Sequence, residues 1–267
     1  MTTVQRIRHD AKFRLLEVQQ VVNITPKMLR VTLSGDQLDG FVSAAHDDHA
    51  KIFFPPPGQA WTSPSAFEPG DGGLPNDTIR RTGRDYTPRR YDPTANTLEI
   101  DFVLHGDGPG SSWAAQARPG QWLGVGGPRG SFVITEVFDW YLLVGDETAL
   151  PAIGRRLEEL PAGARAIVVA EVADAHEEQH FTSNALVDIV WAHRDGGEPG
   201  DLNRLLEALT HVTFPSGEGY AWIAAEASVA KGLRQHLVDE RGVRKDRVKA
   251  AAYWKRGAMA VHETYND

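Results

Sequence analysis

The sequence predicts two domains of different fold class: a six-stranded antiparallel β-barrel over residues 1–136, then an α/β domain with a parallel sheet over residues 137–267. Up to residue 132, segments of strand composition follow one another with one short helical segment, which is typical of a closed barrel. Beyond residue 139, apolar strands alternate with helices, which favours a parallel sheet with helical cover. The 267 residues can bury two moderate cores.

The expected barrel consists of strands joined by turns and one long loop. Its strands are predicted at 13–18, 28–33, 49–54, 84–89, 97–104 and 120–125. Turn residues occur at 23–26 and 91–96, a tight loop at 126–130, and helical composition at 111–117. Residues 58–83 are rich in Pro, Gly, Ser and Asp, and a loop of that length is usually functional or mobile.

The second domain is expected to alternate strands with helices. Its strands are predicted at 140–144, 166–171, 187–192, 220–225 and 248–253. Its helices are predicted at 146–160, 201–209 and 228–241. Open α/β sheets bind their ligands beyond the carboxyl ends of the strands, so the turn at 145–151 is the first candidate for a nucleotide.

Composition excludes several classes of function. A formal net charge of −8 argues against nucleic-acid binding, which needs a basic face. Without cysteine there is no disulfide, thiolate zinc site, iron–sulfur cluster or thiol nucleophile, so redox chemistry would need an organic cofactor or a metal held by His and carboxylates. Residues 1–12 are polar and no apolar run approaches twenty residues, which favours a cytoplasmic protein without membrane spans.

A polar strand and a glycine-rich loop together suit a flavin. In RDYTPR, Arg84 can pair with a pyrophosphate, Tyr86 offers a flat face to an isoalloxazine, and Thr87 offers a hydroxyl at the ring edge. The loop at 105–113 follows, and its backbone N–H groups can receive phosphate oxygens. Taken separately, the two features are more typical of an exposed barrel strand and an ordinary serine-capped connection.

Three other clusters have both a functional and a structural interpretation. Asp146 and Glu147 would hold a dinucleotide loosely, or they only cap a helix. The basic residues at strand ends either converge on an anionic ligand or are separate surface charges; they are Lys51, Arg129, Lys255 and Arg256. Neighbouring His and Asp side chains at 46–49 would point to opposite faces, so a loop is favoured over a metal site. No GxSxG motif supports a hydrolase.

Taken in order, seven stretches of the sequence resemble the siderophore-interacting proteins, a branch of the ferredoxin–NADP reductase superfamily. They are HAKIFFP at 49–55, RDYTPR at 84–89, DFVLHGDGPGSSWA at 101–114, GPRGSF at 127–132, GDETALPAI at 145–153, WIAAEAS at 222–228 and YWKRG at 253–257. Each stretch is common alone, but their joint occurrence over nearly the whole chain is specific.

The resemblance implies an FAD-dependent ferric-siderophore reductase that uses NADPH or NADH. Arg84 would pair with the FAD pyrophosphate, Tyr86 would pack on the isoalloxazine, and Thr87 would approach flavin N5. The other residues expected to bind FAD are Val103, His105, Gly108, Gly110, Ser111, Ser112 and Trp113. NAD(P)H would dock at the turn of Asp146, Glu147, Thr148 and Ala149, and Trp254 is expected among the cofactor-binding residues. Lys51, Arg129 and Lys255, or Arg256 in place of Lys255, would receive the anionic ferric siderophore.

The expected chemistry belongs to the flavin, which takes hydride from the nicotinamide and passes single electrons to Fe(III), with no catalytic side chain and no protein ligand to the metal. Direct use of NAD(P)H is expected rather than ferredoxin, because the chain ends soon after Trp254 without the helical extension of ferredoxin-coupled relatives, and NADPH is the favoured form. Arg194 is a candidate for its 2′-phosphate, and Glu171 is the alternative, for a ribose hydroxyl. A reductase with another acceptor and a non-catalytic siderophore-binding module remain alternatives; a monomer is expected.

Overall fold

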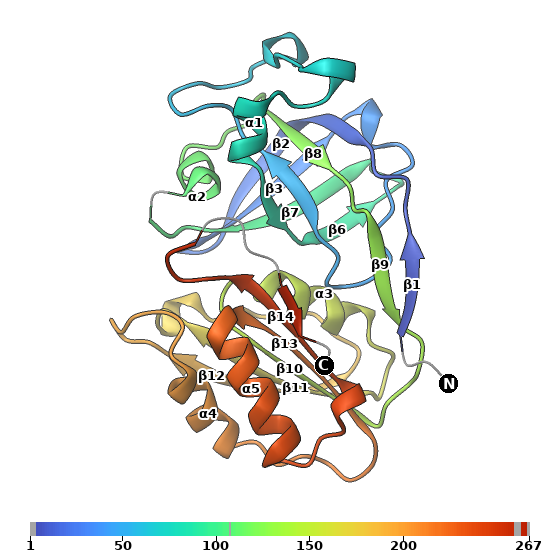
Figure 1. Ribbon diagram of the computed structural model, residues 1–267, viewed down its shortest axis with the longest axis vertical. Helices are drawn as coiled ribbons and strands as arrows, with labels where there is room; N and C mark the ends of the chain where they lie inside the picture. Colours follow the sequence, from blue (N-terminus) through green and yellow to red (C-terminus); the bar gives the residue numbers. More distant parts are fainter. Residues whose placement is uncertain (1–3, 107, 259–262, 266–267) are drawn as a thin grey trace. The chain divides into compact units, whose positions relative to one another are not determined.

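The structure, a computed structural model, describes residues 4–106, 108–258 and 263–265 and divides into two units (Figure 1). One unit comprises Val4–Val133, and the other begins at Ile134. Each unit has a hydrophobic core of its own. Among the described residues, no helix combines the length and hydropathy needed to cross a membrane.

The first unit is built on a curled antiparallel sheet. In spatial order its strands are β5 (Arg84–Tyr86), β4 (Ala50–Phe53), β8 (Trp122–Gly126), β2 (Phe13–Thr25), β3 (Met28–Ser34), β7 (Thr97–Val103) and β6 (Pro88–Asp92). Buried and more exposed residues alternate along β3 and the first half of β2, as expected for strands with one face on a core. A separate two-stranded ribbon pairs β1 (Val4–Arg8) with β9 (Gly130–Ile134).

The two outermost strands of the curled sheet are consecutive in the chain. β5 pairs with β4 and β6 pairs with β7, yet only Thr87 separates β5 from β6. Because successive Cα atoms are only about 3.8 Å apart, both edges of the sheet meet at Thr87. The single strand expected at 84–89 is therefore two strands, and within residues 4–106 and 108–133 the sheet has seven strands rather than the predicted six.

The segment expected to be a long loop is packed against the barrel. It contains short helical segments at Pro64–Ala66, Asp71–Gly73 and α1 (Asp77–Thr82). The Asn76 side chain caps α1 by accepting from the backbone N–H of Ile79 at 3.0 Å. A small apolar cluster joins this segment to the barrel strands; its buried members are Phe53, Trp61, Phe67 and Ile79.

The second unit contains a mixed sheet. Its strands are, in order, β12 (Leu186–His193), β11 (Arg165–Val172), β10 (Trp140–Gly145), β13 (Gly219–Glu226), β14 (Val248–Trp254) and β15 (Glu263–Tyr265). The pairings from β12 to β14 are parallel, as predicted, but β15 runs antiparallel to β14. The wholly parallel prediction was wrong at this edge, where a three-residue strand is too short to show a sequence pattern.

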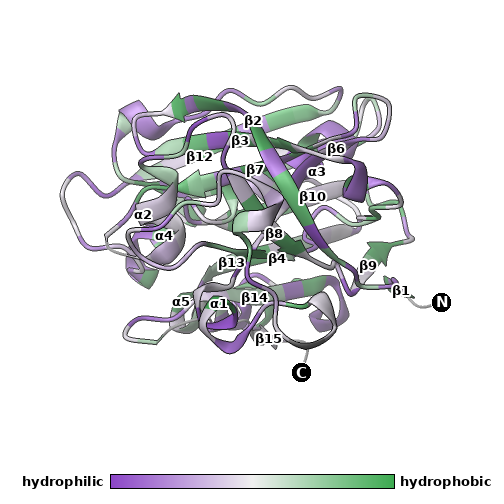
Figure 2. Ribbon diagram, turned by 90° about the horizontal axis from the view of Figure 1, so that it is seen from above, coloured by the Kyte–Doolittle hydropathy of each residue, from purple (hydrophilic) through white to green (hydrophobic). Residues whose placement is uncertain are grey.

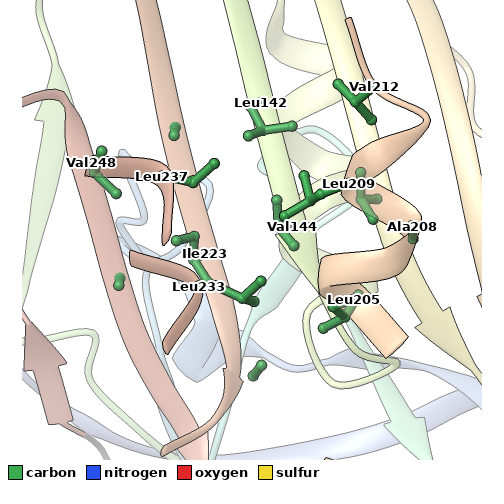
Figure 3. Packing of buried hydrophobic residues seen from close by; sticks show 14 of the residues in the cluster. Leu142, Val144, Leu205, Ala208, Leu209, Val212, Ile223, Leu233, Leu237 and Val248 are labelled. Atoms are coloured by element: carbon green, nitrogen blue, oxygen red, sulfur yellow. The ribbon is translucent and has the colours of Figure 1, made fainter. Parts of the chain in front are cut away.

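Helices cover the faces of this sheet and complete its core. They are α3 (Leu150–Glu159), α4 (Leu202–Thr210) and α5 (Ala227–Asp239). Figure 3 shows Leu205 and Leu209 of α4 and Leu233 of α5 directed toward Val144 and Ile223 of the central strands. β10 and β13 are buried along their full lengths, and their residues are mostly apolar on both faces, with the charged Glu226 at the end of β13 (coloured by hydropathy in Figure 2).

Candidate functional site

Strand β5 fixes the orientation of Arg84 and Tyr86. Both lie on one face of the sheet, because they stand opposite the buried Ile52 and Ala50 of β4. The Tyr86 ring packs with its centroid 4.5 Å from that of Phe102. Burial raises the pKa of the Tyr86 phenol above its ordinary value, against the opposing charge of Arg84. Tyr86 is therefore neutral, and packing fixes its ring.

Arg84 is positioned by the end of the packed segment. Its Nη1 donates to the carbonyl oxygens of Arg81 at 3.0 Å and Gly83 at 2.8 Å, where α1 ends. A guanidinium has five N–H donors and can hold these carbonyls while also binding a phosphate. The segment at 58–83 thus supports the residue expected to bind the pyrophosphate, which its composition did not indicate.

The start of α2 (Pro109–Ala114) lies against Tyr86. A Cβ atom at Gly110 would lie 1.9 Å from the Tyr86 hydroxyl oxygen, so only glycine fits there. Ser111 is buried, and its Oγ accepts from the backbone N–H of His105 at 2.8 Å, which fixes the preceding loop. Ser112 is exposed and Gly108 caps the helix without a side chain. This arrangement leaves main-chain N–H groups at the helix start as the means of holding an anion.

The other residues expected at the flavin differ in accessibility. Thr87 is buried at the meeting point of the sheet edges, whereas Val103 is half-buried at the end of β7 and His105 is exposed. The Trp113 ring packs into the barrel core 5.6 Å from Phe102. Trp113 therefore supports Tyr86 through the core, since both rings contact Phe102.

The cations Lys51 and Arg129 belong to neighbouring parts of the barrel. Lys51 stands opposite Gly126 of β8, and Arg129 is exposed in the loop that follows β8. Buried Arg14 holds this loop by donating to the carbonyl of Gly127 at 3.3 Å. Lys51 forms an ion pair at 2.9 Å with Asp85, the residue between Arg84 and Tyr86. Sequence reasoning missed this carboxylate, although its charge is opposite to that of Lys51.

The sequence predicted that residues 146–149 form the first turn of a helix. In the structure they form a separate turn, and α3 begins after it at Leu150. The buried Asp146 carboxylate accepts from Thr148 N at 2.9 Å, from Thr148 Oγ1 at 2.5 Å, and from Trp254 Nε1 at 2.7 Å. Burial, followed by the charge of Glu147, raises the pKa of Asp146 to about 7, although these hydrogen bonds act in the opposite direction. Ala149 is completely buried.

Glu147 and Arg194 form part of a buried ion network. The two Nη atoms of Arg194 each donate to Glu147 at 2.6 Å, and Nη1 also contacts Glu171 at 3.2 Å. Arg204 of α4 reaches the other oxygen of Glu171 at 3.2 Å. Burial opposes the charge of Arg194, but the carboxylates raise its pKa above the ordinary value. Arg194, the candidate for the 2′-phosphate, and Glu171, the candidate for a ribose hydroxyl, are thus bonded to each other.

The end of β14 carries the last predicted site residues. Trp254 lies against Gly200, where a Cβ would be 3.2 Å from its ring. Lys255 is exposed, and Arg256 donates from Nη2 to the carbonyl of Pro199 at 2.7 Å. The backbone N–H of Arg256 also donates to Glu226 at 3.3 Å. Arg256 is therefore held by its own unit, whereas Lys255 extends into solvent.

The His- and Asp-containing segment at 46–49 belongs to a hydrogen-bonded network. Asp48 accepts from Ser131 Oγ at 2.6 Å and from Ser43 Oγ at 2.9 Å, and His9 bonds Ser131 at 2.7 Å. Among the described residues, no group of three or more His, Cys, Asp or Glu side chains is arranged to hold a metal ion. This network joins the β1–β9 ribbon to the loop before β4.

Comparison with known proteins gives matches along nearly the whole chain. A family model described as siderophore-interacting FAD-binding domain matches residues 17–132, and one described as siderophore-interacting protein matches residues 138–257. The NADPH-dependent ferric-chelate reductase of Escherichia coli K12 is 38% identical over 254 residues, covering 94% of this chain and 96% of that protein. Ferric vibriobactin reductase ViuB of Vibrio cholerae is 34% identical, with 94% and 93% covered.

Solved structures show the same similarity. A siderophore utilization protein from T. fusca is 41% identical, with 97% of this chain and 98% of that chain covered and a TM-score of 0.82. The ferredoxin reductase in carbazole 1,9a-dioxygenase, at 17% identity, 89% and 68% coverage and a TM-score of 0.60, shares the fold. The architecture is therefore a curled antiparallel sheet that matches an FAD-binding domain, followed by an α/β domain with a mixed sheet. The chain belongs to the siderophore-interacting protein family.

Proposed function

We propose that this protein is an FAD-dependent reductase of ferric siderophores that takes electrons from NAD(P)H and releases iron as Fe(II) during iron uptake. The observation that carries the proposal is the close fit of Tyr86 against Gly110, within a region that matches an FAD-binding domain. The names of similar proteins, which include a ferric-chelate reductase and two ferric-siderophore reductases, support the same activity.

FAD suits the residues around β5. Arg84 would pair with its pyrophosphate, Tyr86 would lie against the isoalloxazine, and Thr87 would offer its hydroxyl near N5. Within the stretch from Gly108 to Ser112, the main-chain N–H groups of Gly108, Gly110 and Ser111 would take a phosphate. Pro109 has no N–H and Ser112 N already donates to the Gly108 carbonyl at 2.9 Å, while no acidic side chain lies in the first turn of α2. Val103, His105 and Trp113 would complete the site.

The second unit would orient the nicotinamide donor. The turn of Asp146, Glu147, Thr148 and Ala149 occupies the first β-to-α connection of the sheet, where α/β domains bind nucleotides, and Trp254 is bonded to it. NADPH is the proposed donor, as the name of the Escherichia coli relative indicates for that protein. The bound flavin supplies the redox chemistry, accepting hydride and donating single electrons, while the chain supplies orientation and charge.

The ferric siderophore would be recognised by its negative charge. Lys51, Arg129 and Lys255 or Arg256 are the cations proposed to contact it, in a chain whose net charge is −8. Catecholate and hydroxamate oxygens are hard ligands that hold Fe(II) far more weakly than Fe(III), so reduction releases the metal. No side chain needs to act as a general acid or base, and none needs to coordinate the iron.

The proposal assigns FAD to residues 1–136 and NAD(P)H to residues 137–267. It also takes the protein to be a cytoplasmic monomer without nucleic-acid or membrane partners. Light scattering of the purified protein tests the monomer, and cell fractionation tests the location.

The decisive experiment is a visible absorption spectrum of the purified protein, followed by anaerobic addition of NADPH and then of a ferric siderophore. We expect a flavin spectrum that NADPH bleaches and the ferric siderophore restores, with Fe(II) captured by a colorimetric chelator. A colourless protein that does not retain added FAD would contradict the proposal and favour a binding module. Reoxidation by other acceptors but not by ferric chelates would instead favour an electron-transfer reductase.

A further inference from the structure

The ion pair between Lys51 and Asp85 joins a residue proposed to contact the ferric siderophore to the strand that carries the proposed FAD contacts Arg84 and Tyr86. The residues are direct cross-strand partners on β4 and β5, with Lys51 Nζ 2.9 Å from Asp85 Oδ1. Their side chains are 39% and 24% exposed, so the pair is accessible to a ligand and to salt. Because side chains alternate along a strand, Asp85 lies on the face opposite to Arg84 and Tyr86.

Asp85 reduces the attraction that Lys51 exerts on an anion. A carboxylate at this distance occupies an N–H donor of the ammonium and adds a negative charge next to it. Partly exposed ion pairs are weak, however, and a lysine ammonium is a compact charge on a flexible stem. A multiply charged anion can therefore displace Asp85 from Lys51, whereas a neutral ligand gains nothing by doing so.

Arg129 provides the contrast. Its side chain is exposed, and within the described part of the chain its guanidinium has no carboxylate partner. Among the described residues, Lys51 thus has a carboxylate that competes with its ligand, whereas Arg129 does not.

We propose that Asp85 is a specificity-determining residue that competes with the ferric chelate for Lys51 and so limits how strongly the enzyme favours highly charged chelates. The inference rests on the proposed function, because it takes Lys51 as a contact of the chelate. It goes beyond that function by assigning a role to Asp85, the residue between Arg84 and Tyr86.

The test measures KM for chelates of different charge with the full-length protein, FAD and NADPH. The acceptors are a trianionic ferric tris-catecholate, monoanionic ferric EDTA and a neutral ferric tris-hydroxamate. For Asp85→Asn we expect KM to fall about fivefold for the trianion, less than about twofold for the monoanion and not at all for the neutral chelate, because Coulomb energy scales with ligand charge. Added salt reduces the effect.

Two further variants identify the mechanism. In a Lys51→Gln background, Asp85→Asn should lose at least half of its effect on the trianion, since there is no longer a cation to release. Asp246→Asn is the matched control, because it removes one carboxylate from an exposed ion pair with Arg244 at 2.7 Å in the other unit, and it should leave every KM unchanged. Equal effects of Asp85→Asn on charged and neutral chelates, or equal effects with and without Lys51, overturn the inference.

FAD occupancy is measured in every variant. If Asp85→Asn retains less FAD, Lys51→Arg provides the second test: a bidentate pair with Asp85 should hold the cation more firmly and raise KM for the trianion, and an unchanged KM contradicts the inference. A wild-type protein that reduces no ferric chelate defeats the proposed function itself. A wild-type protein that reduces them, with charge dependence unaltered by Asp85→Asn, defeats only the role of Asp85.

Discussion

Asp146 and Trp254 are joined by a hydrogen bond in which the indole Nε1–H donates to Asp146 Oδ2 at 2.7 Å. The residues lie at the carboxyl ends of β10 and β14, with β13 between these strands in the sheet. Thr148 donates twice to the other carboxylate oxygen. The carboxylate therefore fixes its own turn and the orientation of the indole together.

The Asp146–Trp254 bond should be sensitive to pH near neutrality. Burial raises the pKa of Asp146 from 3.8 to about 7, so between these values the folded chain holds a proton that the unfolded chain releases. The contribution of this carboxyl to the free energy of unfolding is thus full below pH 3.8 and is lost as the pH rises to about 7. We expect the Trp254 indole N–H resonance, assigned with Trp254→Phe, to shift with a midpoint near pH 7. A midpoint near the ordinary carboxyl value would contradict this.

Gly110→Ala should weaken FAD binding more than tenfold, because a Cβ would lie 1.9 Å from the Tyr86 hydroxyl and force the ring or α2 to move. Gln116→Ala is the control, because it shortens an exposed side chain just beyond the end of α2 and should leave FAD affinity unchanged. Titration of the apoprotein with FAD, followed by flavin fluorescence, compares the two. Similar affinities for both variants would show that Gly110 is not required.

Arg84→Ala should lower FAD affinity about 10- to 100-fold, the cost of losing hydrogen bonds from a charged donor. The variant Arg90→Ala, which removes an exposed arginine from β6, should retain FAD. FAD occupancy after gel filtration measures both. Unchanged occupancy of Arg84→Ala would refute the pyrophosphate assignment.

Arg194→Ala should behave as a folding variant. It leaves Glu147 without its charge partner and the buried Glu171 with Arg204 alone, and breaking a buried pair costs about 3–5 kcal/mol of unfolding free energy. The ratio of kcat/KM for NADPH and NADH should change less than about twofold, because both ends of the guanidinium are already bonded. Urea unfolding and steady-state kinetics measure the two effects, with Arg244→Ala as the exposed ion-pair control. A large loss of NADPH preference with unchanged stability would restore Arg194 as the 2′-phosphate ligand.

Arg129→Ala should raise KM for a trianionic ferric chelate by about fivefold or more, since it removes an exposed positive charge. NADPH oxidation with a neutral acceptor serves as the control and should proceed as in the wild-type protein. An equal loss with both acceptors would indicate that the residue is needed for the structure of the loop after β8.

Local patterns predicted most of the fold, and long-range pairing explains the differences. The largely apolar runs at 166–171 and 220–225 correspond to β11 and β13, since a strand buried on both faces consists mainly of apolar residues; the buried Glu171 near the end of β11 is an exception. By contrast, the break at Thr87 arises because β5 and β6 pair with different neighbours, which the hexapeptide RDYTPR cannot show. The helix expected from residue 146 starts at Leu150, because Asp146 is held by a residue 108 positions away.

The same distinction applies to the site. RDYTPR and the glycine-rich loop are local motifs, so their chemistry could be proposed from residue types alone. The ion-pair partners of the charged residues could not be predicted in this way. Asp85 meets Lys51 because of the register between β4 and β5, and Arg194 meets Glu147 because of the order of β12, β11 and β10 in the sheet. Sequence therefore indicated which charges were present but not which of them were already paired.

The position of Thr87 couples the affinity for FAD to the stability of the first unit. One residue joins the first and last strands of the sheet, and the residues proposed to hold FAD flank it. A ligand that binds only the folded chain stabilises it by mass action. Bound FAD would therefore stabilise the connection between β5 and β6 at Thr87. Limited proteolysis of the apoprotein should therefore begin in β5 or β6, and saturating FAD should delay this first cleavage.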